Sequence, residues 1–196
     1  MQFTTRRRFI SLISLLSGLT LVGSAVLAHA ADNPKVLLKT NMGNIKLELY
    51  PEKAPISVDN FVKYVKKGQY NGTIFHRVIG NFMIQGGGLD KNMKEKSTGN
   101  PIKNEAQNGL KNETYSLAMA RTADPHSATA QFFINVQDNP MLDFPGRDGW
   151  GYTVFGKVIE GMDVVDQIKQ VPTANGPMYQ NVPVKPVVIE SASLVK

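Results

Sequence analysis

Cysteine is absent from all 196 residues of the chain. The fold must therefore be stable without disulfide bonds, and thiol catalysis, zinc–thiolate sites and redox chemistry are excluded. Histidine is almost as scarce, with three residues. One of them, His126, lies near Asp124 and Ser127, but three neighbours in one loop cannot easily form a catalytic triad, and no G-x-S-x-G motif is present. The sequence therefore argues against a hydrolase.

Signals for metal ions and nucleotide cofactors are missing as well. The run Gly86–Gly88 is not followed by the Gly-Lys-Ser/Thr of a phosphate-binding loop. Asp143 and Asp148 lack the alternating acidic positions and the terminal glutamate of a calcium loop. We therefore expect no cofactor and no metal ion.

A strong excess of charge of one sign is also lacking. The chain carries 22 basic and 16 acidic residues, a formal net charge of +6. Three of the basic residues lie in the first 30 positions, which contain no acidic residue, so 19 basic residues against 16 acidic ones leave the remainder at +3. A modest, scattered excess of lysine indicates a solvated surface, and we expect no nucleic-acid partner.

The first 30 residues contain the three parts of an export signal in order. A cationic cluster at 6–8 precedes an uncharged stretch from Phe9 to Ala28, and Ala28-His29-Ala30 is a small-x-small cleavage site. We predict a signal peptide at residues 1–30 and one mature domain at 31–196. The alternative is an uncleaved membrane anchor, since about twenty uncharged residues just span a bilayer, but serine and glycine dilute the stretch. The arginine cluster leaves the general secretory and twin-arginine routes both open.

Beyond residue 31, alternating and glycine-punctuated patterns predict short strands and two helices. The expected strands are 35–40, 45–50, 73–79, 82–85, 116–120, 131–136, 153–158 and 187–195. Apolar residues from Val58 to Val65 recur at helical spacing after Pro55, and 162–169 repeats the pattern. The polar stretch 89–112 is expected to be a long surface loop. Many strands with two helices favour a mainly β fold, an antiparallel barrel capped at its ends by helices.

The stretch from Phe75 to Gly88, FHRVIGNFMIQGGG, combines polar and apolar residues in an unusual way. It places Arg77 and Gln85 on strands that are otherwise apolar. An isolated arginine of this kind most often extends its charged end out of a core, or pairs with an acid such as Glu105 or Glu113. The residues alone do not decide between this structural role and a functional role for Arg77.

Five motifs follow one another along the chain: FHRVI, FMIQGG, SLAMAR, QFFIN and VFGKVIEGMDVV. Their order and spacing are similar to those of cyclophilins. The resemblance extends over almost all of 36–195 and is greatest to bacterial periplasmic members. It implies a closed antiparallel eight-stranded β-barrel capped by two α-helices. It also implies a cofactor-free peptidyl-prolyl cis/trans isomerase, located in the periplasm, that acts on proline-containing unfolded or partly folded polypeptides.

The resemblance further implies a site. Arg77 would assist catalysis most directly, and Gln85 would hold the carbonyl side of the substrate. Substrate would be bound by an apolar wall for the proline ring, by the adjoining peptide groove and by supporting side chains: His76, Phe82, Met83, Ala120, Arg121 through its backbone, Gln131, Phe133, Met141, Leu142 and Tyr152. The other aromatic residues of these motifs, Phe75, Phe132 and Phe155, are expected in the core.

Three positions depart from the pattern of the family. Met141 stands where many eukaryotic members have a tryptophan that supports cyclosporin binding, so sensitivity to that drug stays open. Tyr152 replaces a common pocket histidine, and Gly80-Asn81 replaces a frequent Pro-Gly turn.

Two functions remain after these exclusions. The first is an isomerase that accelerates the folding of exported proteins, and the second is a proline-recognising chaperone or binding module with little catalysis. The presence of Arg77 favours the first, because a pure binder would need only the apolar pocket. We expect a monomer, since no long apolar stripe is left over, and no stable membrane insertion after cleavage.

Cleavage of the leader has a direct test. We expect mass spectrometry of the mature protein to give the mass of residues 31–196, because the small-x-small site ends at Ala30. A mass that still includes residues 1–30 would favour a membrane-tethered protein instead.

Overall fold

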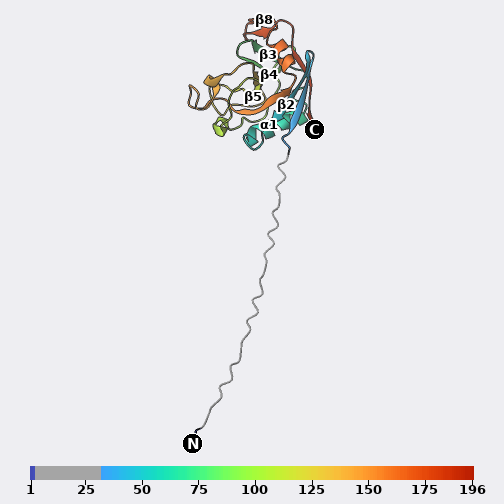
Figure 1. Ribbon diagram of the computed structural model, residues 1–196. Helices are drawn as coiled ribbons and strands as arrows, with labels where there is room; N and C mark the ends of the chain where they lie inside the picture. The colour runs from blue at the N-terminus through green and yellow to red at the C-terminus, as the bar shows by residue number, and fades with distance from the viewer. Residues whose placement is uncertain (3–31) are drawn as a thin grey trace. The chain divides into compact units, whose positions relative to one another are not determined.

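The computed structural model describes residues 1–2 and 32–196 (Figure 1). Apart from its first two residues, the predicted signal peptide lies outside this range, so its cleavage stays a prediction. Within the described residues, no helix has both the length and the apolar character that crossing a bilayer requires.

Eight strands close into an antiparallel barrel in the order β1-β10-β3-β4-β6-β5-β7-β2. They are β1 (Lys35–Thr40), β2 (Gly43–Leu49), β3 (Thr73–Ile79), β4 (Met83–Asp90), β5 (Ser116–Met119), β6 (Phe132–Asn135), β7 (Val154–Glu160) and β10 (Val188–Val195). Closure pairs the first strand with the last, with Lys35 opposite Val195. Every barrel strand has a neighbour on both sides, as full closure requires. The expected eight-stranded barrel is confirmed.

Most boundaries differ from the sequence-based ones by one or two residues, and two differences are larger. Strand β4 does not end at Gln85 but continues through three glycines to Asp90. Glycine is needed at Gly88 because a neighbouring side chain lies close to the backbone there. A β-carbon at Gly88 would be only 2.5 Å from Cγ of Gln131. In addition, β8 (Thr173–Ala174) and β9 (Val182–Pro183) form a separate two-stranded sheet. Its strands are too short to produce an alternating pattern.

The polar loop that follows β4 stabilises the first helix, α1 (Pro55–Lys66). Glu105 accepts hydrogen bonds from the backbone N–H groups of Ile56 (3.0 Å) and Ser57 (2.8 Å), and from the Ser57 hydroxyl (2.8 Å). N–H groups in the first turn of a helix have no acceptor within the helix, and a carboxylate is favoured at this positive end. One of the two acids considered as a partner for Arg77 is therefore bound elsewhere.

Both helices bury an apolar face against the barrel. Helix α1 packs on β10, and α2 (Met162–Ile168) packs on β2. Phe61 of α1 is fully buried, and its ring centroid lies 4.9, 5.4 and 5.2 Å from those of Tyr70, Phe132 and Phe155. Phe75 belongs to the same core cluster. The three phenylalanines expected in the core are all found there.

Truncation of Phe61 should show how much this aromatic cluster contributes to stability. We expect Phe61→Ala to lower the free energy of unfolding by about 3–5 kcal/mol, since it removes apolar burial and leaves a cavity. Urea unfolding followed by circular dichroism measures the change. Ile56→Ala, at an exposed position of the same helix, should change it by about 0.5 kcal/mol or less. Equal effects of the two substitutions would contradict this account of the core.

Candidate active site

A β-bulge in β3 determines which way Arg77 faces. Phe75 pairs with Gly86 of β4, but Arg77 pairs with Gln85, so two residues of β3 oppose one of β4. Regular alternation would put Phe75 and Val78, three positions apart, on opposite faces of the strand. Both nevertheless lie in the main core. The extra residue of the bulge allows this, because His76 and Arg77 then both fall between the two core positions.

Arg77 borders a small cavity of about 90 Å³ on the outside of the barrel. Its lining comes from β3, β4 and β6 and from the segments that follow β3, β5 and β6: Arg77, Phe82, Met83, Gln85, Ala120, Arg121, Phe133, Leu142 and Tyr152. Nine of the residues implied by the resemblance are therefore brought together in space. The cavity is far smaller than the roughly 300–1,000 Å³ of sites for cofactors and drug-sized ligands. Its size suits one side chain.

The floor of this cavity is apolar. Met83 and Phe133 are buried in a second hydrophobic cluster, separate from the main core, and Phe82, Leu142 and Tyr152 pack against it. The rings of Phe133 and Tyr152 meet edge to face, with centroids 5.7 Å apart. A side chain without polar groups could bury its surface here without leaving a polar group unsatisfied.

The guanidinium of Arg77 is held only loosely. Its Nη1 lies 3.5 Å from Oε1 of Gln85, the outer limit of a hydrogen bond, while Nε2 of Gln85 donates to Oε1 of Gln131 at 2.9 Å. Among the ion pairs of the described residues, none includes Arg77. The pairing of Arg77 with Glu105 or Glu113 that the sequence left open is not formed. Its N–H groups therefore remain available at the rim of the cavity.

Arg121 has the opposite environment. Its side chain is 3% exposed, forms an ion pair with Asp148 and donates to the carbonyl oxygens of Gly151 (3.1 Å) and Thr122 (3.0 Å). The guanidinium also lies over the Tyr152 ring, 4.4 Å from its centroid. The hydrogen bond from Arg121, together with backbone N–H groups, lowers the pKa of Asp148 to about 2. We expected only the backbone of Arg121 to contribute, but its side chain supports the Tyr152 wall.

A cluster of buried asparagines, which sequence reasoning missed, holds part of the cavity lining in place. Asn139 donates to the carbonyl oxygen of Phe82 (2.8 Å) and to Oδ1 of Asn135 (2.7 Å), and its own carbonyl accepts from the N–H of Leu142 (2.9 Å). Asn135 donates in turn to the Ser116 hydroxyl (2.8 Å). Two residues that line the cavity, Phe82 and Leu142, are thus held by one network. The asparagine of QFFIN, inside a strand that is otherwise apolar, was the available signal.

Three of the implied site residues lie outside the lining of the cavity. Gln131 is one step removed, through its bond to Gln85. Met141 lies in the 3₁₀ turn Pro140–Leu142 and is 44% exposed. His76 is 3% exposed, packs against the Tyr179 ring at 5.9 Å, and its Nδ1 has no hydrogen-bond partner. Burial lowers the pKa of His76 from 6.5 to about 4; a backbone hydrogen bond at Ile74 raises it and the charge of Arg77 lowers it.

No group of three or more histidine, aspartate or glutamate side chains in the described part of the chain is placed to hold a metal ion. The side chains present at the cavity can bind an apolar ring and donate hydrogen bonds beside it.

Comparison with known proteins agrees with this geometry. The family model described as cyclophilin type peptidyl-prolyl cis-trans isomerase/CLD matches residues 35–194. The chain belongs to the cyclophilin family. A peptidyl-prolyl cis-trans isomerase of Acinetobacter baylyi is 61% identical to this cyclophilin over 176 residues, which cover 90% of this chain and 93% of the relative.

Two further relatives extend the comparison. Peptidyl-prolyl cis-trans isomerase B of Escherichia coli is 57% identical over 161 residues, which cover 81% of this cyclophilin and 98% of the relative. A cyclophilin-type isomerase of Cryptosporidium parvum, crystallised in the presence of the dipeptide Ala-Pro, matches with a TM-score of 0.68 at 27% identity. That match covers 83% of this chain and 99% of the solved one.

Burial of His76 should make this cyclophilin sensitive to mild acid. In the unfolded chain His76 takes up a proton below about pH 6.5, but in the folded protein it does so only near pH 4. The contribution of neutral His76 to the free energy of unfolding is therefore fully present above pH 6.5. It is lost as the pH falls from 6.5 to 4, by at most roughly 3 kcal/mol. Urea unfolding across this range measures the loss. His76→Gln, which cannot ionise, should lose less; parallel curves for the two proteins would contradict the assignment.

Proposed function

We propose that this chain accelerates rotation about X-Pro peptide bonds in exported polypeptides, with Arg77 as the catalytic residue. Amide resonance imposes a barrier of about 18–20 kcal/mol on this rotation, so uncatalysed exchange takes tens to hundreds of seconds. A rate increase of about five decades requires a barrier reduction of roughly 7 kcal/mol. Because no covalent bond is made or broken, neither a nucleophile nor a cofactor is needed.

The proposed mechanism depends on a difference between the planar and the twisted amide. In the planar amide the nitrogen lone pair is delocalised and accepts no hydrogen bond. When the bond is half rotated, the nitrogen becomes pyramidal and its lone pair can accept one. A donor aimed at this nitrogen stabilises the transition state and not the ground state, which is the condition for raising the rate. Arginine suits this role because it keeps its proton at all working pH values.

The cavity supplies the second requirement, which is a fixed proline ring. Phe82, Met83, Phe133 and Leu142 would bury the pyrrolidine ring, so the remainder of the substrate can rotate about the X-Pro bond. Gln85, oriented by Gln131, would hold the carbonyl on the other side of that bond. The observation that carries the proposal is the position of the Arg77 guanidinium, free of carboxylate partners and at the rim of an apolar cavity that fits one ring.

The cellular setting is proposed from the first 30 residues. Their cationic, uncharged and small-x-small segments support export and cleavage after Ala30. The relatives named above include bacterial proteins, and we place the mature protein in the periplasm as a monomer. Its clients there would be unfolded or partly folded chains whose maturation waits on slow prolyl steps. The chain itself has no cysteine and so needs no oxidation to fold.

Replacement of Arg77 separates an isomerase from a binding module. We expect Arg77→Ala to lower kcat/KM on an Ala-Pro peptide about 100-fold or more, because loss of one transition-state donor typically has this effect. A protease-free isomerisation assay measures the rate, and thermal unfolding checks that the fold is intact. Arg147→Ala, the same substitution at an exposed position of a nearby loop, serves as the matched control and should keep full activity.

The outcome has two informative alternatives. Equal rates for the wild type and Arg77→Ala would remove this mechanism. If the wild type binds proline peptides but does not accelerate their rotation, the binding-module function replaces the isomerase.

A second variant tests the geometry of the donor. Arg77→Lys keeps the charge but not the planar fork of donors, so it should retain only a small part of the wild-type activity.

A further inference from the structure

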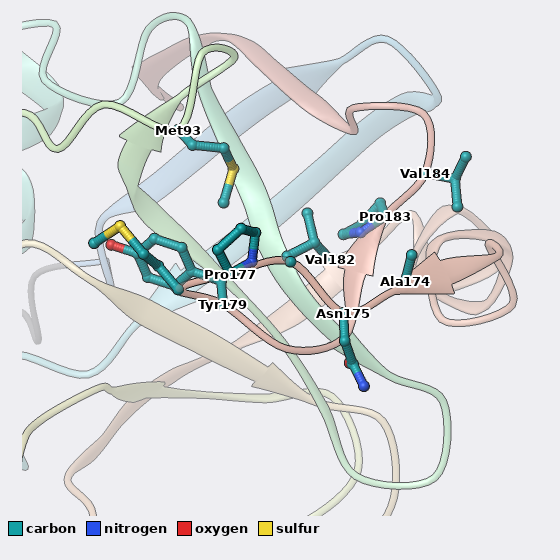
Figure 2. Close-up of a pocket in the computed structure, with 10 residues that line it drawn as sticks. Met93, Ala174, Asn175, Pro177, Tyr179, Val182, Pro183 and Val184 are labelled. Carbon is teal, nitrogen blue, oxygen red and sulfur yellow. The ribbon is translucent and has the colours of Figure 1, made fainter.

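A second and larger hollow lies beside the β8–β9 hairpin. It has a volume of about 480 Å³ and is formed by the hairpin together with Met93, which projects over it from the turn after β4 (Figure 2). None of the ten residues that line it is charged. The side chains that give it its apolar character are Met93, Pro177, Met178, Tyr179, Val182 and Val184. We call this feature the hairpin groove. In volume it matches a site for several side chains rather than one.

The hairpin groove exposes apolar side chains that a folded protein usually covers. Met178 is 84% exposed and Val184 is 63% exposed. Apart from Met1, they are the most exposed large hydrophobic residues in the described part of the chain. Isolated exposed apolar residues are common, but their grouping around one uncharged hollow is typical of an interaction site. Methionine suits such a site, because its flexible thioether adapts to ligands of different shape.

The hairpin that forms the groove packs on β3, the strand that carries Arg77. Tyr179, which lines the groove, packs against His76, and His76 is the residue next to Arg77 on the bulge. The hairpin is also fastened to this strand by a hydrogen bond from the N–H of Val78 to the carbonyl oxygen of Asn181 (2.9 Å). One strand, β3, therefore contributes Arg77 to the proline cavity and contacts the hairpin that forms the groove through His76 and Val78.

We propose that the hairpin groove binds an apolar segment of the same polypeptide whose proline occupies the small cavity. This inference rests on the proposed function and deepens it, because it makes unfolded chains with apolar residues near the proline the preferred substrate class. Partly folded chains expose such residues before they are buried. An extended peptide advances about 3.3 Å per residue, so spacings of four to eight residues sample distances of about 13–26 Å from the proline. The groove would hold the client while the neighbouring X-Pro bond rotates.

The test uses three fluorescein-labelled peptides. The first is a four-residue Ala-Pro peptide that is too short to reach both sites. The second carries Ala-Pro and a Leu-Val-Leu triplet, placed four to eight residues before or after the proline in a glycine–serine background. The third replaces the triplet by serines. Fluorescence anisotropy gives Kd, and the isomerisation assay gives kcat/KM for each peptide.

The variants are Met178→Ser, Val184→Ser and the double substitution, with Ile56→Ser as the control at an exposed apolar position on α1. We expect the triplet peptide, at its best spacing, to bind the wild type about tenfold more tightly than the serine peptide. The double variant should lose this advantage and retain full kcat/KM on the four-residue peptide. Ile56→Ser should behave as the wild type. Because Met178 is largely exposed, Met178→Ser alone keeps the test valid if the double variant unfolds.

Three results would overturn the inference. The first is equal affinity of the wild type for the triplet and serine peptides at every spacing. The second is a loss of activity on the four-residue peptide equal to that on the triplet peptide, which would give the groove a structural role. The third is concentration-dependent dimerisation in sedimentation that Met178→Ser abolishes, which would assign the groove to a second copy of the chain. Failure of the proposed function is distinct, since it shows as an inactive wild type on the four-residue peptide whatever the groove binds.

Discussion

The bulge at His76 and Arg77 is the constraint on which the rest of the site depends. A closed barrel must fill its interior, and here Phe75 and Val78 of β3 both turn inward to do so. One additional residue between them lets the strand satisfy the core and still present an arginine on its outer face. The same local irregularity places a histidine under the hairpin, so two hollows of different size come to lie beside one strand.

The two arginines at the cavity differ in how many of their N–H donors are already bound within the protein. Arg121 uses its donors on Asp148 and on two carbonyl oxygens and is almost fully covered. Arg77 has one long contact with Gln85. A guanidinium with satisfied donors stabilises the wall that it belongs to, whereas one with unsatisfied donors can respond to a nitrogen that changes its hybridisation. The asparagine network holds Phe82 and Leu142 in place, which the proposed mechanism requires of the residues that would bind the proline ring.

Much of the fold was predictable because its strands and helices follow strong local periodicities, and the order of five motifs indicated which family supplies the site. What failed to be predicted depends on contacts between distant residues. The bulge depends on the register of β3 against β4, which the sequence of β3 alone does not give. The capping of α1 by Glu105 joins residues 48 or more positions apart. The hydrogen bond that holds the Arg121 side chain is donated to Asp148, 27 positions away. The β8–β9 hairpin has strands of two residues, too short for any alternation.

The pairing of β1 with β10 also has a consequence for how the molecule is made. The opening strand, at residues 35–40, finds one of its two neighbours only at 188–195. At synthesis rates of about 5–20 residues per second, it waits on the order of ten seconds or more for that neighbour to emerge. The barrel can therefore close only after translation of the domain is complete, because its first strand lacks one of its two neighbours until then.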